Sequence, residues 1–184
     1  MSLGQGLEDS AISQAIKVAG WIIPLLQSIH IVTIGVVFVS SLMIALRVFG
    51  RMRADEPFPV VWKRFAPWMW IGLVVMVITG VFLVLGEPVR EFTALSFWLK
   101  MTLLAVAVII TAIFGRTFGP AAASRAAGSA AQAAGAYAPT RDEFSPGAKA
   151  VAGGIMVIWL AIIFLGRAIA YDVEVWGSLS LHGT

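Results

Sequence analysis

The sequence predicts an all-α membrane protein, a bundle of four transmembrane helices. Of its 184 residues, 59% are hydrophobic and only 12% are charged, and the mean hydropathy is +0.91. Soluble domains have roughly 45–50% apolar and about 25% charged residues. Four segments have the roughly 20 apolar residues needed to cross a bilayer core: 21–49, 67–86, 95–115 and 147–170. An even number of spans returns the chain to its starting side.

Residues 1–20 are predicted to form an interfacial segment ahead of the first span. Asp9 and Ser10 are favourable helix N-cap residues. A helix that begins there places four apolar residues on one face: Ile12, Ala15, Ile16 and Ala19. Such a face suits a helix lying on the outer leaflet, and a frayed leader is the alternative. The stretch does not have the pattern of a cleavable signal peptide, so we expect the first span to act as its own insertion signal.

Basic residues predict that both termini lie on the extracytoplasmic side, because Lys and Arg in short loops resist translocation. They gather after the first and third spans: Arg47, Arg51, Arg53, Lys63 and Arg64, then Arg116, Arg125, Arg141 and Lys149. The connection between the second and third spans carries only Arg90, beside Glu87 and Glu91. The basic loops are therefore expected inside.

The two inner loops carry no recognisable chemistry. Residues 54–66 contain Pro57, Pro59 and Trp62, and we expect an interfacial chain there, with a helix starting at Pro67. Residues 119–145 are rich in Ala and Gly, and 121–134 are compatible with a helical turn or two. We find no repeat and no second domain, and residues 172–184 form a tail.

Three ionisable residues lie inside the apolar runs: His30, Lys100 and Arg167. Such groups cost several kcal/mol in hydrocarbon unless they meet each other, a cavity or a cofactor, so they mark a candidate functional site. At 1.5 Å per residue, His30 lies roughly 13 Å from the outer end of its span. Lys100 and Arg167 lie nearer the outer ends of theirs, and Glu87 lies at the boundary. All three are expected in the outer half.

Small and mildly polar residues predict which helix faces point inward. The first span has such a stripe around His30 and the third has one around Lys100: Gln27, Thr33, Val37 and Ser41, then Ser96, Ala107 and Thr111. The second span repeats small residues every seven positions, which lets neighbouring helices approach closely: Gly72, Thr79 and Gly86. These faces predict a bundle with a central site.

Each ionisable residue also has a structural explanation. A lone intramembrane His often serves as a hydrogen-bonding packing residue. Lys100 and Arg167 lie close enough to the boundary to extend their charges into the headgroups. The functional interpretation therefore depends on the convergence of the three residues.

Several short motifs follow in a familiar order. They are His30 with Gly35 and Leu46-Arg47-Val48-Phe49-Gly50; Pro67-Trp68 with Thr79-Gly80; Phe97-Trp98-Leu99-Lys100; and Gly166-Arg167-Ala168-Ile169-Ala170-Tyr171. In these motifs the chain resembles a family of small, mostly uncharacterised bacterial four-helix membrane proteins. More distantly it resembles the HemJ-type protoporphyrinogen oxidases and the membrane domain of CopD-type copper-resistance proteins. The resemblance implies a multi-pass protein of the bacterial cytoplasmic (inner) membrane.

The HemJ-type resemblance implies a functional pair and a cofactor. In that family the His of the first helix and the Lys of the third form the pair, and haem b is associated with the protein. By position, His30 would contact the porphyrin or ligate its iron, and Lys100 would meet a carboxylate. Those oxidases usually have further histidines at helix ends, whereas the other histidine here is His182, in the tail. This departure weighs against porphyrinogen oxidation, and porphyrin binding remains the expectation.

We therefore expect a haem b-binding membrane subunit that passes electrons between an external donor and a quinone or partner redox protein. Neutral imidazole is a good iron ligand, which makes His30 the predicted metal ligand. Lys100 and Arg167 would pair with the propionates. One alternative is HemJ-like oxidation of a porphyrinogen or another lipophilic substrate, whose carboxylates Lys100 and Arg167 would hold. The other is a non-redox accessory subunit of a larger membrane complex.

Composition limits the remaining classes. The absence of cysteine excludes disulfides and thiolate chemistry. One intramembrane histidine, without clustered Met pairs, supplies too few ligands for copper transport. The pI of 9.7 and net charge of +3 are explained by loop orientation and anionic lipid, so we expect no nucleic-acid binding. The expected partners are membrane lipid and either a larger redox complex or further copies of the chain.

Overall fold

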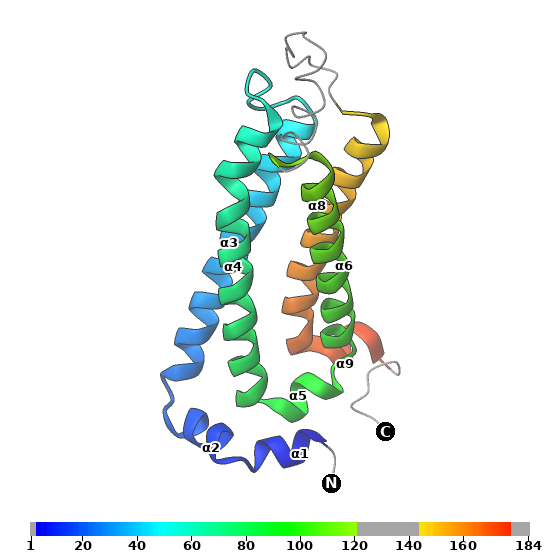
Figure 1. Ribbon diagram of the computed structural model, residues 1–184. Coiled ribbons are helices and arrows are strands. Elements are labelled where there is room, and N and C mark those ends of the chain that lie inside the picture. Colours follow the sequence, from blue (N-terminus) through cyan, green and yellow to red (C-terminus); the bar gives the residue numbers. More distant parts are fainter. Residues whose placement is uncertain (1–2, 121–143, 178–184) are drawn as a thin grey trace.

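The computed structural model describes residues 3–120 and 144–177, which form a bundle of long helices with short helices at one end (Figure 1). Four helices are long and apolar enough to cross a membrane. They are α3 (Ile22–Val48), α4 (Phe58–Gly86), α6 (Leu95–Phe118) and α8 (Pro146–Ala168). The described residues contain no strand. The predicted fold class, an all-α membrane bundle, is confirmed.

The two ends of the bundle differ in what covers them. One end, here called the terminal end, carries the short helices: α1 (Leu3–Glu8), α2 (Ala11–Val18), α5 (Pro88–Thr93), η1 (Ile169–Tyr171) and α9 (Asp172–Trp176). The opposite end, here called the loop end, carries the connection between α3 and α4, the end of α6 and the start of α8 (Figure 1). The predicted helical turns in residues 121–134 lie outside the described residues.

The start of α4 corrects the sequence analysis. The helix begins at Phe58 and includes Pro67, so the expectation that it starts at Pro67 is wrong, and residues 58–66 of the expected interfacial chain belong to the helix. Pro57 precedes the helix and Pro59 lies in its first turn, where a missing N–H costs nothing. Pro67 removes one intrahelical hydrogen bond, which membrane helices tolerate because neighbouring groups satisfy the freed carbonyl. The other three long helices begin and end within three residues of their predicted spans.

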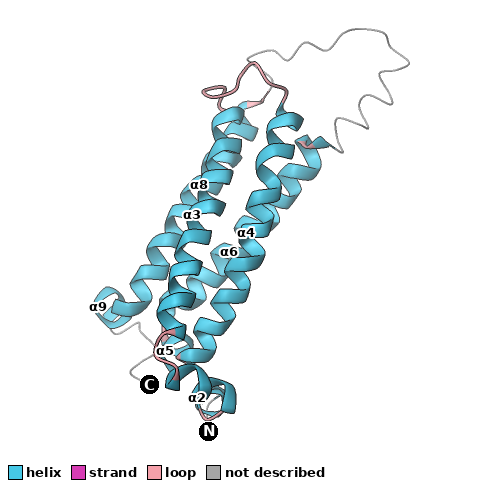
Figure 2. Ribbon diagram, turned by 90° about the vertical axis from the view of Figure 1, so that its left-hand side faces the viewer, coloured by secondary structure: helices cyan, strands magenta, loops and turns pink. Residues whose placement is uncertain are grey.

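The long helices are arranged as two antiparallel pairs, α3 with α4 and α6 with α8, and α3 also packs along α8 (Figures 1 and 2). The predicted small face of α4 is buried at Gly72, Thr79 and Gly86. A Cβ added at Gly72 would lie 2.9 Å from Cγ2 of Val37. This small face therefore allows α3 to pack closely against α4, as the sequence predicted for neighbouring helices.

The apolar core fills the loop end and the middle of the bundle. At the loop end, Phe58 lies 5.0 Å from Phe144 between ring centroids and 6.0 Å from Phe114. In the middle, Val37, Met69 and Trp159 are all at most 2% exposed. Toward the terminal end α3 has no buried residue before Thr33, and α6 has none between Phe97 and Ala107. The protein's own side chains therefore cover these two faces only in part.

A buried carboxylate on α9 connects this helix to the start of α6 at the terminal end. Asp172 is 3% exposed and accepts hydrogen bonds from the backbone N–H groups of Leu95 and Ser96, at 3.1 and 3.0 Å, and from the Ser96 hydroxyl at 2.7 Å. Trp176 donates its indole N–H to the same hydroxyl at 2.7 Å. Ala94, the residue before α6, has no side chain that caps the helix. Asp172 therefore satisfies the first turn of α6.

The N-terminal segment is helical and packs against the bundle. Ser10 accepts a hydrogen bond from the N–H of Ser13 at 3.3 Å, as expected for the predicted cap of α2. Ile16 is 7% exposed, and its Cγ2 would lie 3.6 Å from a Cβ at Gly86. The segment therefore lies across the end of α4, and α1 packs along α5.

We expect Gly115→Ala to destabilise the contact between α4 and α6. The indole ring of Trp62 lies against Gly115, and an added Cβ would approach three of its ring atoms within 3.1 Å. Overpacking of this kind costs about 1–3 kcal/mol. The control is Gly154→Ala in α8, which meets nothing within 4 Å. Thermal unfolding in detergent should show a lower Tm for Gly115→Ala alone, and equal Tm values for both variants would contradict this packing.

We expect Asp172→Asn to loosen the terminal end. The amide presents N–H groups where the carboxylate accepts hydrogen bonds, so a buried donor of α6 loses its partner at a cost of about 1–3 kcal/mol. Glu174→Gln, at an exposed position of the same helix, removes the same charge without this loss. Limited proteolysis should cleave Asp172→Asn near α9 faster than Glu174→Gln; matching cleavage rates would exclude the anchoring role.

Candidate functional site

His30 lies on α3 in the terminal half of the bundle, about 12 Å along the helix from Ile22. Its Nδ1 is 2.8 Å from Oγ1 of Thr79 on α4. The Thr79 hydroxyl is also 2.9 Å from the carbonyl oxygen of Val75 and 3.1 Å from that of Met76. A hydroxyl has one proton, and donating it to a carbonyl leaves the oxygen free to accept from Nδ1–H. The arrangement favours the tautomer whose lone pair is on Nε2.

Gly80 follows Thr79 and gives the imidazole its space. A Cβ added at Gly80 would lie 3.4 Å from Cε1 of His30, closer than most side-chain contacts. Thr79 therefore fixes the ring by a hydrogen bond while Gly80 allows the helices to approach it. Both residues belong to the Thr79-Gly80 pair singled out in the sequence.

Lys100 lies on α6, in the other helix pair. It is half-buried, and its charge acts on both His30 and Glu91. Its Cδ would lie 3.8 Å from a Cβ at Gly166 on α8, and its ammonium lies 5.9 Å from the centroid of the Phe97 ring. The alkyl chain thus packs on α8, and the ammonium lies near the ring of Phe97 on its own helix. The relation of Lys100 to His30 is therefore electrostatic only, through the charge of the ammonium.

Arg167 takes a different position. Its side chain is exposed, and its guanidinium lies 5.6 Å from the centroid of Tyr171, four residues further along the chain. No hydrogen bond among the described residues joins it to His30 or to Lys100, and its ring contact is with Tyr171. Its charge lies at the terminal end of α8, next to the Gly166 position against which Lys100 packs.

Glu91 is a residue of the site that the sequence analysis did not select. Its side chain is only 12% exposed and lies 3.6 Å from Arg90, which also pairs with Glu87. Burial raises the pKa of Glu91 above its usual value, although the charges of Lys100 and Arg90 oppose this rise. The sequence analysis placed Glu87 at the membrane boundary. The sequence contains no pattern that indicates which acidic residue of this segment lies nearest to Lys100. The acidic neighbour of Lys100 is Glu91.

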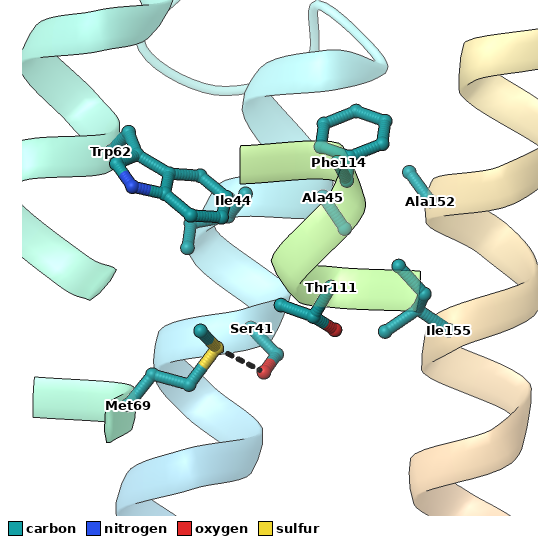
Figure 3. A pocket seen from close by; sticks show the side chains of 9 residues that line it. All are labelled: Ser41, Ile44, Ala45, Trp62, Met69, Thr111, Phe114, Ala152 and Ile155. Carbon is teal, nitrogen blue, oxygen red and sulfur yellow. Dashed lines mark hydrogen bonds between the residues drawn. The ribbon is translucent and has the colours of Figure 1, made fainter. Parts of the chain in front are cut away.

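The two cavities characterised in the described residues lie away from His30. The larger, of about 20 Å³, is lined by residues of all four long helices near the middle and loop end (Figure 3). The second, of about 10 Å³, lies beside it. Neither is lined by His30, Lys100 or Arg167. Residues 3–120 and 144–177 contain no group of three His, Asp or Glu side chains arranged to hold a metal ion.

The fold and these residues define a multi-pass membrane bundle with a single intramembrane imidazole held between two helices. Residues 8–124 match the model of a family of unknown function, DUF6644, and the chain belongs to this family. The match includes His30, Thr79 and Lys100 and ends before Arg167. No curated protein and no solved structure matches the chain. These comparisons provide no link to the HemJ-type oxidases or to CopD.

The raised pKa of Glu91 predicts a pH-dependent stability. A carboxyl whose pKa is higher in the folded state binds its proton more tightly there, so folding stability falls as pH rises above the ordinary value of 4.5. Glu91→Gln should flatten this part of the stability curve, and Glu87→Gln, which removes a more exposed acid, should not. Tm values measured from roughly pH 4 to pH 8 test this. Parallel curves for wild type and Glu91→Gln would contradict it.

Proposed function

We propose that this protein is a haem b-binding membrane subunit that passes electrons between an external donor and a quinone or a partner redox protein, with His30 as the axial ligand. The observation that carries the proposal is the hydrogen bond between His30 Nδ1 and Thr79. A histidine that ligates a metal through one ring nitrogen usually donates its other N–H to an oxygen. His30 has this arrangement, with the Nε2 lone pair available.

The residues present fit a haem better than a bare metal ion. A bare ion needs several protein ligands, and the described residues supply no such cluster. A porphyrin brings four nitrogens of its own and requires only an axial ligand, apolar walls and cations for its propionates. The partly exposed apolar residues of α3 near His30, such as Ile29 and Ile31, and of α6 near Lys100, such as Leu99, would supply the apolar walls. When bound, haem would supply one-electron chemistry at that position.

The charged residues have separate roles in this proposal. Lys100, whose ammonium lies beside the ring of Phe97 in the terminal half of the bundle, would pair with a propionate within the bundle. Arg167, exposed at the terminal end, would pair with one at the membrane surface. Glu91 limits the excess positive charge that Lys100 would otherwise place in the membrane. These carboxylate-binding roles position the cofactor and require no proton transfer.

The test is the absorption spectrum and iron content of protein extracted gently in mild detergent. We expect a Soret band and about one iron per chain. His30→Ala should abolish both, and His182→Ala should retain both because only His30 lies in a span. Thr79→Val keeps the shape but removes the hydrogen bond to Nδ1, and should weaken haem binding about 10- to 100-fold.

Two other outcomes would replace this proposal. Protein without a Soret band or iron that always copurifies with one membrane complex would indicate an accessory subunit. Formation of fluorescent porphyrin from protoporphyrinogen, lost in Lys100→Ala, would indicate an oxidase. A band of equal intensity in wild type and His30→Ala would exclude His30 as the ligand.

A further inference from the structure

The connection between α3 and α4, at the loop end of the bundle (Figure 1), concentrates positive charge. Residues 47–64 contain five basic and two acidic side chains. Nη1 of Arg53 lies 2.6 Å from Oε1 of Glu56, and Nη1 of Arg64 lies 3.3 Å from Oε2 of the same carboxylate. One negative charge therefore compensates two guanidiniums. Both side chains remain accessible, at 37% and 46% exposed, so they present a net positive charge to their surroundings.

The turn that carries Arg53 is held in a fixed conformation. Arg53 has a φ of 51°, in the left-handed region that residues other than glycine rarely adopt. Such backbone strain costs about 1–3 kcal/mol and persists where the surroundings enforce it, often at ligand-binding positions. Here the backbone N–H of Glu56 donates to the carbonyl of Arg53 at 3.1 Å, and Nε of Arg47 donates to the carbonyl of Glu56 at 2.7 Å. The guanidinium of Arg53 is therefore preorganised at the carboxylate that it shares with Arg64.

The exposed face of α4 below Arg64 has the polarity order of a phospholipid. Arg64, Trp68 and Ile71 are spaced by four and then three residues, so they share one helix face. Trp68 is 62% exposed and Ile71 is 59% exposed, and they lie about 6 Å and about 10 Å from Arg64 along the helix axis. Tryptophan favours the membrane interface, and aliphatic side chains favour the acyl region. A lipid phosphate at Arg64 therefore has its glycerol beside Trp68 and its acyl chains along Ile71.

The neighbouring apolar residues indicate that the anion belongs to a lipid. Phe49 is 37% exposed and Met52 is 44% exposed, and they flank Arg51, whose side chain is also exposed. Exposed apolar residues beside cations suit the headgroup region of a membrane, where acyl chains and phosphates are both within reach. A soluble anion would leave Phe49 and Met52 in water.

We propose that Arg53 and Arg64 bind the phosphate of an anionic phospholipid in the leaflet at the loop end. Their planar guanidiniums donate to the phosphate oxygens, a geometry for which arginine is better suited than lysine. Arg51 and Lys63, both exposed and close in the chain, repel the cationic headgroup of a zwitterionic lipid, so the site prefers a lipid with a net negative charge. The acyl chains lie along the exposed face of α4. This lipid site is independent of the proposed haem.

Native mass spectrometry of the intact protein tests the preference. The protein is transferred from detergent that contains equal amounts of phosphatidylglycerol and phosphatidylcholine with identical acyl chains. We expect the wild type to retain phosphatidylglycerol several-fold more often, and Arg53→Gln and Arg64→Gln to lose this preference. Arg90→Gln is the matched control, because Arg90 is 48% exposed and also paired with acidic residues, but lies at the terminal end. Equal retention of the two lipids by the wild type, or an equal effect of Arg64→Gln and Arg90→Gln, would overturn the proposal.

Fluorescence quenching locates the lipid without a change to either arginine. Bromine on an acyl chain near the glycerol quenches a tryptophan that the lipid contacts. We expect brominated phosphatidylglycerol to quench the wild type more than phosphatidylcholine with the same chains, and excess inorganic phosphate to leave this difference unchanged. Trp68→Phe should remove the difference, and Trp98→Phe, which removes a tryptophan 49% exposed near the terminal end, should keep it. Equal quenching by the two lipids, an unchanged difference in Trp68→Phe, or displacement by inorganic phosphate would refute the lipid site.

Discussion

Inside a membrane, a polar group has to find its partner within the protein, because hydrocarbon offers none. This constraint explains most of the side-chain hydrogen bonds along the spans. The hydroxyls of Thr33 and Thr102 return to their own helix backbone, and Asp172 satisfies the first turn of α6. The imidazole of His30 pairs with a hydroxyl on a different helix, that of Thr79. The two helices can make that bond only because they pack closely.

The close packing of α3 against α4 originates in the seven-residue spacing of small residues. Gly72 admits Val37, and Thr79, two turns further along, then meets His30 at hydrogen-bonding distance. The spacing follows from the helix itself, since positions seven apart share a face. One feature of the sequence thus sets both the distance between the helices and the orientation of the ring. The position of the imidazole and the packing of these two helices have the same cause.

Features with a local origin were predictable from the sequence. The four spans follow from composition, and the buried face of α4 follows from the repeat of Gly72, Thr79 and Gly86. The start of α4 was missed because Pro67 was interpreted as a helix breaker, although neighbouring groups in a membrane bundle tolerate it. Asp172 was missed for another reason. It pairs with Leu95 and Ser96, 77 and 76 residues away, and no short-range pattern indicates such a contact. The position of the Glu91 side chain likewise depends on how α5 turns, which the local sequence does not indicate.

The contrast between the two halves of the bundle bears on what the terminal half contains. From the loop end to the middle, the helices bury their facing side chains against one another and leave only two small cavities among the described residues. In the terminal half, α3 has no buried residue before Thr33 and α6 has none between Phe97 and Ala107, and His30 has one ring nitrogen engaged. Lipid tails can cover the apolar residues but cannot satisfy Nε2 or the charge of Lys100. A ligand with a flat apolar body, an acceptor for the imidazole lone pair and an anionic edge would satisfy all three requirements together, and the proposed haem b has this combination.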